Sequence, residues 1–489
     1  MYRDGPQWAW IMTSSGLPDD TVHDVIIIGA GPAGLGVAAV TAGAGLLTLV
    51  LDENMHPGGQ IYRAASHSPF PQGQVLGKDY WRKGTRMIRR AYASGAHIIP
   101  RAIVWGITPD HVVMARVDGQ PRRFAARCVV LAGGAMERPF PIPGWTLPGV
   151  MTVGAAQTML KASGVVPPAP MVIAGRGPLI WLLAAQYRRA GQDIAAILIT
   201  AADRQWWKGL AALPFFLLSG DAWYGLRLLA SAVMHRVPVH RGVMSIRAEG
   251  TACLEQVRWS GKNGQDKVLP ARTLLLHHGV VPNPNLAMAL GVPHVWDRAQ
   301  ASFRPAPAGT ADYPDGIVCV GDGAGIGGSR LAALGGRMAG QAIVAARGRS
   351  RRNLLNWLHS VSMRARIALA RRGRMFVDCM FRPASHFRQP ADETVICRCE
   401  GVTAGQVRSA AHEGCIGPNQ AKAFLRCGMG PCQGRLCGLT VSDLIAQTRD
   451  RDPADVGYLN QRLPARPATL GDMAAMPAGT AAIRAVTPG

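Results

Sequence analysis

Acidic residues are scarce in this chain. Asp and Glu together number 30 against 53 Lys and Arg, which leaves a formal net charge of +23 at pH 7. A surplus of this size attracts nucleic acid, an anionic membrane or an acidic partner. The sequence shows no DNA- or RNA-binding module, and aromatic residues make up only 6% of it. We therefore expect no nucleic-acid partner.

The N-terminal region lacks the apolar core of a signal peptide. The uncharged stretch 25–51 is long enough to resemble a membrane span, but it holds six glycines in a strand–turn–helix pattern. Residues 1–22 are interpreted as a leader, within which Met1 or Met12 starts the protein. We expect a cytoplasmic protein, and its charge is compatible with peripheral association at the inner face of a membrane.

Of the ten cysteines, six lie between Cys397 and Cys437. Disulfides are rare in the cytosol, so this clustering favours a metal site over cross-links.

The chain is organised around the stretch 25–52, in which an apolar strand leads into Gly29, Gly31 and Gly34. A helical run of small residues, a second apolar strand and an acid follow. This order is typical of a dinucleotide site: the glycines allow a tight turn, close backbone approach and close helix packing, and the acid binds a ribose hydroxyl. The predicted cofactor contacts here are Gly29, Gly31, Pro32, Ala33, Gly34, Asp52 and Glu53.

Three later segments resemble those of two-domain flavoproteins that hold FAD. They are a Gly-Gly turn at 58–59, an apolar strand that ends in small residues at 129–134, and the strand–Gly–Asp motif at 316–328. No cysteine follows the Gly-Gly turn, and no C-x-x-C of the thioredoxin reductase kind is present, so we exclude dithiol chemistry beside the flavin. The further predicted cofactor contacts are Gly59, Gln60, Arg63, Ala132, Gly133, Gly321 and Asp322.

A second βαβ pattern spans 171–200 and is degenerate. Gly175 and Gly177 keep two glycine positions, but Ile180 replaces the third and the second strand ends at Thr200 instead of an acid. Both changes weaken nucleotide binding. We expect either an architectural domain or a site for another nucleotide, and NAD(P) binding is doubtful.

The cysteine cluster pairs Cys397 with Cys399 and Cys427 with Cys432, each pair on a turn-rich loop. Four such thiolates suit a [2Fe–2S] cluster, because loop N–H groups can hydrogen-bond the sulfurs. Structural zinc and free thiols are the alternatives, although the spacing is not the usual zinc C-x2-C. Cys415 and Cys437 are spare candidates. Thr403 is expected to cap a helix between the two pairs.

The region 337–377 contains ten arginines and no acid. Its apolar residues recur at helical spacing, which predicts a pair of amphipathic helices that face a partner.

We predict an α/β fold with two Rossmann-like dinucleotide-binding domains, the second inserted in the first as in glutathione-reductase-like flavoproteins. A small helical domain follows at the C-terminus. The expected parts are a leader (1–22), the FAD domain (23–165 and 291–345), the inserted NAD(P)-like domain (166–290), a basic helical linker (346–392), the cysteine domain (393–450) and a partner-binding arm (451–489).

The segment 397–438 resembles the bacterioferritin-associated-ferredoxin type of [2Fe–2S] domain. Together with GAGPAG, PGGQIYR, GWTLPGV and GDGAGIGG, the chain resembles the flavin/iron–sulfur A subunits of heteromeric amino-acid and opine dehydrogenases. The resemblance implies an amine-oxidising flavoprotein β subunit that holds the substrate, and a respiratory electron acceptor. It leaves room for an FMN at a subunit interface and for a small third subunit. It also implies that 458–470 is an arm that reaches the partner.

We find no catalytic acid–base pair in the sequence, which agrees with a substrate site in the partner. We therefore expect an electron-transfer subunit that carries FAD and a [2Fe–2S] cluster. The alternatives are a self-sufficient NAD(P)H-dependent oxidoreductase and a non-catalytic scaffold with relic sites.

Overall fold

The computed structural model describes residues 21–70, 73–203, 206–218, 237–307, 309, 313–349 and 354–475. Both candidate start residues, Met1 and Met12, and the end of the predicted arm lie outside the described residues.

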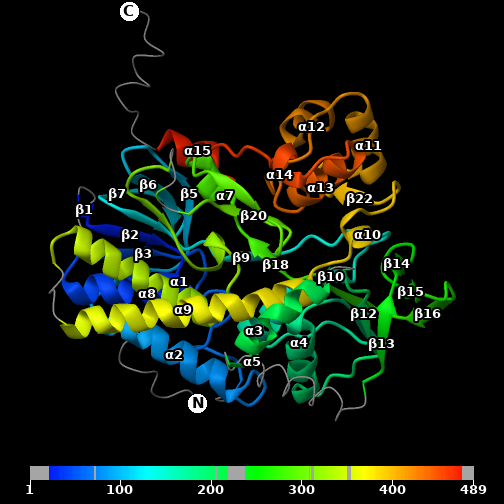
Figure 1. The fold of residues 1–489 in the computed structure, drawn as a ribbon, viewed down its shortest axis with the longest axis horizontal. Coiled ribbons are helices and arrows are strands. Elements are labelled where there is room, and N and C mark those ends of the chain that lie inside the picture. Colours follow the sequence, from blue (N-terminus) through cyan, green and yellow to red (C-terminus); the bar gives the residue numbers. More distant parts are fainter. Residues whose placement is uncertain are drawn as a thin grey trace, which may run out of the picture.

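The first motif forms a sheet of five parallel strands, in the order β21-β8-β2-β3-β4. Figure 1 shows β2 and β3 of this sheet in blue, beside α1 and α8. In β2, Val25 and Ile27 face one side and Ile26 the other, as strand geometry requires. These strands are β2 (Val25–Ile28), β3 (Thr48–Leu51), β4 (His97–Ile99), β8 (Val129–Leu131) and β21 (Ile317–Cys319).

Helices cover one face of this sheet and a smaller sheet covers the other. The helices α1 and α8 approach closely through glycine: a Cβ on Gly336 would lie 2.1 Å from the carbonyl oxygen of Ala33. The helices are α1 (Pro32–Thr41), the 3-10 turn η2 (Ala42–Ala44), α2 (Lys78–Ala93) and α8 (Ser329–Ala346). The smaller sheet contains β1 (Val22–His23), β5 (Ala102–Ile107), β6 (Val112–Val117) and β7 (Gln120–Ala126).

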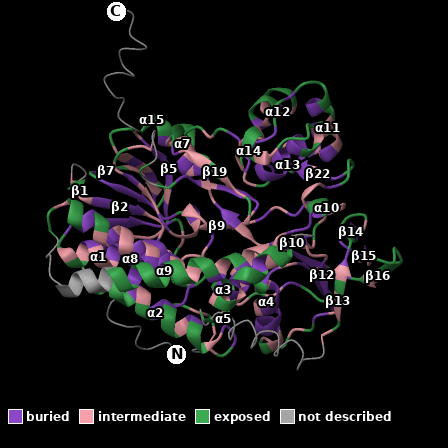
Figure 2. Cartoon of the chain, in the orientation of Figure 1, coloured by how far each residue is buried: buried purple, intermediate pink, exposed green. Residues whose placement is uncertain are grey.

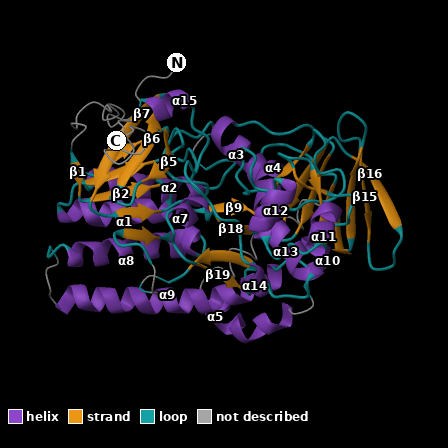
Figure 3. Ribbon diagram, turned by 90° about the horizontal axis from the view of Figure 1, so that it is seen from above, coloured by secondary structure: helices purple, strands orange, loops and turns teal. Residues whose placement is uncertain are grey.

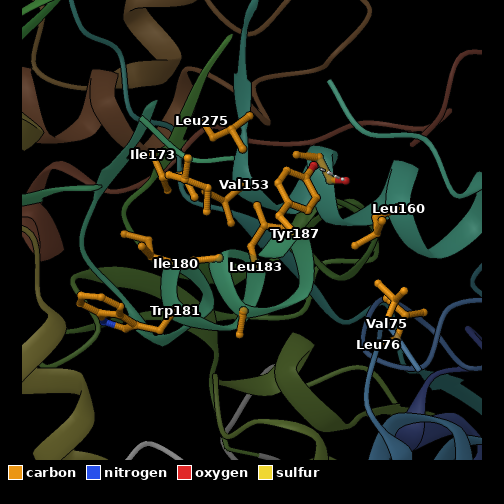
Figure 4. Packing of buried hydrophobic residues seen from close by; sticks show 14 of the residues in the cluster. Val75, Leu76, Val153, Leu160, Ile173, Ile180, Trp181, Leu183, Tyr187 and Leu275 are labelled. Carbon is orange, nitrogen blue, oxygen red and sulfur yellow. Dashed lines mark hydrogen bonds between the residues drawn. The ribbon is translucent and has the colours of Figure 1, made fainter. Parts of the chain in front are cut away.

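The second βαβ pattern belongs to another parallel sheet, in the order β10-β17-β11-β12-β13. Figure 4 shows its helical side, where Ile180, Leu183 and Tyr187 pack against Val153 and Leu275. The strands are β10 (Val150–Thr152), β11 (Met171–Gly175), β12 (Ala196–Thr200), β13 (Val239–Val243) and β17 (Thr273–His277); the helices are α3 (Val153–Ser163) and α4 (Pro178–Arg189). An antiparallel sheet packs on the opposite face and contains β14 (Ser245–Glu249), β15 (Gln256–Ser260) and β16 (Asp266–Pro270).

A two-stranded antiparallel ribbon joins the two halves. It pairs β9 (Ala135–Glu137), which follows β8, with β18 (Val280–Pro282), which precedes β21. All strands of the second sheet lie between β9 and β18 in the chain, so the second domain is inserted in the first. The return to the first sheet passes through α7 (Asn285–Ala289), β19 (His294–Asp297) and β20 (Ser302–Pro305), and η4 (Gly321–Ala324) follows β21.

The arginine-rich region forms the long helix α9 (Leu354–Phe381), which runs along one edge of the molecule (Figure 3). The sequence predicts here a pair of amphipathic helices that face a partner; the structure has two helices, α8 and α9, but Met363 and Ile367 of α9 are buried against Leu334 of α8. Toward its C-terminal end α9 contacts η3 (Trp206–Ala212) and α5 (Leu213–Leu218). Much of its surface remains exposed, whereas the sheet strands are buried (Figure 2).

The cysteine region forms a small helical unit with its own buried cluster. The cap predicted at Thr403 is confirmed, since Thr403 and Gln406 form a capping box. Its elements are α10 (Ser385–Arg388), β22 (Val395–Cys397), β23 (Val402–Thr403), α11 (Ala404–His412), α12 (Pro418–Leu425), α13 (Gly438–Thr448) and α14 (Pro453–Val456).

The described part of the predicted arm packs on its own chain. Leu459 is fully buried, the amide of Ala465 donates to the carbonyl of Trp105 at 2.6 Å, and α15 (Leu470–Ala474) lies against β7. Through residue 475, this segment therefore ties the cysteine unit back to the first domain instead of extending away.

Candidate functional site

A cavity of about 730 Å³ lies between the carboxyl ends of the two parallel sheets. This is where open α/β sheets bind their ligands. Most of the residues predicted to contact a cofactor line it: Gly29, Gly31, Pro32, Ala33, Asp52, Glu53, Gly59, Gln60, Ala132, Gly133 and Asp322.

Three predicted contacts are not among the lining residues. A Cβ on Gly34 would lie 1.9 Å from the carbonyl oxygen of Gly29, so this glycine allows the helix to pack on the strand. Arg63 donates to Oε1 of Gln60 at 3.1 Å. Gly321 lines a second cavity of about 1340 Å³, which shares Gln300, Asp322 and Arg374 with the first.

The floor of the first cavity is a turn that only small residues can form. Gly29 has φ +105°, and a Cβ there would meet the carbonyl oxygen of Ala132 at 2.5 Å. A Cβ on Gly59 would lie 2.7 Å from Cα of Gly31, so the Gly-Gly turn lies directly against this loop. Helix α1 begins with Pro32 at its N-terminus and has no side-chain cap. Its free N–H groups are therefore available to a phosphate.

The two adjacent acids of this domain play different parts. Asp52 is buried, and its carboxylate already accepts hydrogen bonds from the amide of Ala30 (2.5 Å) and from Asn54 through both the amide (2.8 Å) and Nδ2 (2.7 Å). Burial raises the pKa of Asp52. Glu53 is exposed, and its Oε2 accepts from Arg466 at 2.5 Å. Both acids line the cavity, and of the two only Glu53 is exposed.

Asp322 belongs to the strand–Gly–Asp motif at 316–328, which also lines the first cavity. Its Oδ1 accepts hydrogen bonds from the amides of Gly327 and Gly328, both at 2.8 Å. One carboxylate oxygen thus shapes the loop before α8, and the cavity wall includes this residue.

Sequence reasoning missed a buried lysine beside the cavity. Nζ of Lys161 donates to the carbonyls of Gln60 (3.0 Å) and Ile61 (3.1 Å) and to Oε1 of Gln157 (2.8 Å). The side chain is 2% exposed, and burial, assisted by the nearby charge of Arg63, lowers its pKa to about 7. Lys161 fixes the backbone of the predicted flavin-contacting loop.

A Glu–His pair also lines the cavity, with His277 buried and Glu137 partly buried. Nδ1 of His277 lies 2.5 Å from Oε1 of Glu137, whose Oε2 accepts from the amide of Gly154 at 2.7 Å. The contact joins positions 140 residues apart, so no local pattern could have revealed it.

The cysteine unit reaches the same cavity through Arg435. This residue lies between Cys432 and Cys437, lines the cavity, and donates to the carbonyls of Cys432 (3.1 Å) and Ala465 (2.7 Å). Burial lowers its pKa to about 10. The loop that carries two of the cysteines therefore forms part of the wall of the predicted flavin site.

The thiols gather in two groups. The side chain of Cys397 hydrogen-bonds with Cys427 and Cys437, contacts that lower the pKa of Cys397 and raise those of the other two. Cys399 contacts Cys432 and lies in the second group. Cys415 instead donates to the carbonyl of Gly417. The structure thus places Cys437, expected to be a spare, beside Cys397, although no three His, Cys, Asp or Glu side chains in the described ranges form a ready metal cage.

No helix in the described part of the chain has the length and apolar character needed to cross a membrane.

Comparisons with known proteins agree with this architecture. The family profile described as pyridine nucleotide-disulphide oxidoreductase matches residues 23–301, and that of the sarcosine oxidase A3 domain matches residues 392–477. The L-proline dehydrogenase structure from P. horikoshii has a TM-score of 0.69 at 18% identity, covering 93% of this chain and 79% of that one. This likeness shows the fold.

Two relatives are similar over nearly their whole length. The A subunit of opine oxidase from Agrobacterium tumefaciens is 41% identical over 95% of this chain and 94% of that protein. The HcnB subunit of hydrogen cyanide synthase from Pseudomonas aeruginosa is 31% identical over 90% of this chain and 96% of that protein. The chain therefore belongs to the FAD-dependent pyridine nucleotide-disulphide oxidoreductase family and, within it, to the A subunits of opine oxidase and related heteromeric amine oxidoreductases.

Proposed function

We propose that this chain is the electron-transfer subunit of a heteromeric amino-acid or opine dehydrogenase. A partner flavoprotein oxidises the C–N bond, and this chain takes the electrons onward to a respiratory acceptor. The observation that carries the proposal is the shared cavity: its wall combines the FAD-type glycine turn with Arg435 from the loop between Cys432 and Cys437. A flavin accepts two electrons and releases them singly, and an iron–sulfur cluster carries one at a time.

The residues present fit FAD. The close approach of Gly31 and Gly59 leaves backbone without side chains beside the N-terminus of α1. These groups would hold the pyrophosphate, Glu53 would bind the adenosine ribose, and Asp322 would support the ribityl end. Lys161 would hold the loop at Gln60 and Ile61 in place by hydrogen bonds to their backbone carbonyls.

The cysteine unit fits a [2Fe–2S] cluster in its donor chemistry. The thiols come from two loops of one small domain, and thiolates are the ligands that such clusters require. The proposed ligands remain Cys397, Cys399, Cys427 and Cys432, with Cys437 as a fifth thiol in contact with Cys397. Iron content of the single Cys→Ser variants would identify the four ligands.

The partner is proposed to be an amine-oxidising flavoprotein β subunit; an interfacial FMN and a small third subunit are further components. The second cavity opens between α8 and α9 and includes the exposed Arg364 and Arg371. These guanidinium groups would suit the phosphate of an FMN.

Peripheral membrane association is also part of the proposal. Trp206 and Trp207 of η3 are 42% and 58% exposed, and α9, which contacts η3, exposes Arg372 outside the lining of the second cavity. Exposed tryptophan beside arginine is typical of proteins that lie on an anionic membrane surface.

The second candidate is a self-sufficient NAD(P)H-dependent oxidoreductase, favoured by the presence of Gly177 and Pro178 in the cavity wall. In that case the isolated chain would transfer electrons from NADH or NADPH to a dye without any partner.

The test is co-expression with a candidate amine-oxidising flavoprotein, followed by a dye-reduction assay with opines, proline, hydroxyproline and glycine. We expect one of these substrates to reduce the dye with the complex and none to do so with either protein by itself. If the complex is inactive with amines while the single chain oxidises NADPH, the proposal is wrong and the second candidate is right.

A further inference from the structure

The glycine turn of the second domain is engaged by the chain itself. In a parallel α/β sheet the phosphates of a nucleotide lie at the turn after the first strand, and the adenosine lies beyond the second. Here that turn is Gly175-Arg176-Gly177, and β12 ends at Thr200. We infer that residues 380–383, where α9 ends, occupy the adenosine position and close this domain to pyridine nucleotides.

Contacts with His277 explain why positions 175 and 177 must be glycine. Gly175 and Gly177 have φ of +135° and +148°, and a Cβ on Gly175 would lie 1.8 Å from the carbonyl oxygen of His277. A Cβ on Gly177 would lie 2.7 Å from the imidazole ring of His277. The same carbonyl accepts from the amide of Arg176 at 2.7 Å. The contact at Gly175 matches that of Gly29 with Ala132 in the first domain, so it does not distinguish the two turns. At Gly177, where a nucleotide site lets the pyrophosphate approach, the imidazole of His277 lies close instead.

The arginine in the turn binds protein backbone. Nε of Arg176 donates to the carbonyl of Met380 at 2.9 Å, and its NH1 donates to the carbonyl of Thr200 at 3.0 Å. The guanidinium carbon lies 6.0 Å from the centre of the Phe381 ring. This cation thus joins the end of β12 to the end of α9 through hydrogen bonds from Nε and NH1 to two backbone carbonyls.

The chain beyond β12 pairs with the segment that follows α9. Ala202 forms an antiparallel β-bridge with Pro383, and Arg382 lies 3.7 Å from Asp203. Thr200, which stands where a ribose-binding acid would be, is itself engaged: its hydroxyl lies 3.2 Å from Nε2 of His278. Both the side chain at the ribose position and the backbone beside it are therefore occupied.

The donor specificity of the chain follows from this arrangement. The part of the cavity near Gly177 and His277 stays open toward the flavin site. On the adenosine side, Phe381, Arg382 and Pro383 form the cavity wall, where the adenosine of NAD(P) would have to lie. This closure would hold whether or not an amine-oxidising flavoprotein is the electron donor, so its test is separate from that of the proposed function.

The first experiment uses the full chain loaded with FAD, so that the first site is filled. NADH and NADPH are titrated anaerobically to about 1 mM while the flavin absorbance is followed, and ADP-ribose is titrated by calorimetry to the same limit. We expect no bleaching and no saturable binding. Either bleaching or a dissociation constant below about 100 µM would overturn the closure.

The second experiment tests the anchor by hydrogen exchange. Arg176→Ala should speed amide exchange in 380–388 by about tenfold or more, because the hydrogen bonds from a charged donor to this segment and to Thr200 are lost. Arg241→Ala, at an exposed arginine of the same sheet, is the matched control, and peptides from β2 and α1 report on global unfolding. Exchange in 380–388 that stays at the control rate would show that Arg176 does not hold the segment.

Discussion

Replacing each of the neighbouring acids Asp52 and Glu53 by its amide, one at a time, tests which of them contacts the flavin cofactor. Glu53 lies in the cavity wall, so Glu53→Gln should weaken FAD binding and leave the fold intact. Loss of one charge-assisted hydrogen bond to a ribose hydroxyl is worth about 1.5–3 kcal/mol, which corresponds to a roughly 10- to 100-fold rise in the dissociation constant.

Asp52→Asn should instead lower the stability of the fold and leave FAD affinity almost unchanged. The Asp52 carboxylate accepts from the amides of Ala30 and Asn54, and an asparagine amide would turn a donor toward one of them. Leaving a buried amide unsatisfied costs about 1–3 kcal/mol of unfolding free energy. FAD affinity is measured by fluorescence titration of the apoprotein, and stability by urea unfolding. Weakened binding in Asp52→Asn at unchanged stability, with no effect of Glu53→Gln, would refute the assignment.

Three further changes test other parts of the site. Gly34→Ala should destabilise the chain by at least about 1–3 kcal/mol in a urea titration, because its Cβ would meet the carbonyl of Gly29; normal stability would refute the packing. Lys161→Met should remove a pH-dependent cost to folding, because burial of Lys161 disfavours its charged form. With a folded pKa of about 7, the unfolded chain binds more protons between pH 7 and about 10, so the stability of the wild type relative to the variant should rise by about 1.4 kcal/mol per pH unit; a flat difference would contradict this. Cys437→Ser should lower bound iron if this thiol is a ligand, whereas Cys253→Ser, at an exposed site outside the cysteine unit, should not.

Much of the fold could be predicted from patterns that are local in the sequence. The order of strand, glycines, helix and strand around Gly29 requires a βαβ unit, and the cap at Thr403 is a short-range signal that the structure confirms. The assignment of an α/β flavoprotein fold and of the subunit family is confirmed by the comparisons.

The groups that complete the site come from contacts between distant positions. Lys161 meets Gln60 across 101 residues, and Glu137 meets His277 across 140. Periodicity and spacing describe only neighbours along the chain, so they give no information on such pairs. The hydrogen bonds of Asp52 were hidden for a related reason: the amide of Ala30, which engages its carboxylate, belongs to another strand end.

The surface was the least predictable part. Charge and periodicity suggested that α9 faces a partner, but its apolar residues Met363 and Ile367 serve the chain's own core. An apolar stripe on a helix says that something covers it, and the covering element depends on the tertiary fold.

The most direct test of the account is the cofactor content of the full chain purified under anaerobic conditions. The account predicts about one FAD and about two iron atoms per chain, with an electron paramagnetic resonance signal after reduction that is typical of a [2Fe–2S] centre. Protein that folds and yet lacks either the flavin or the iron would contradict it.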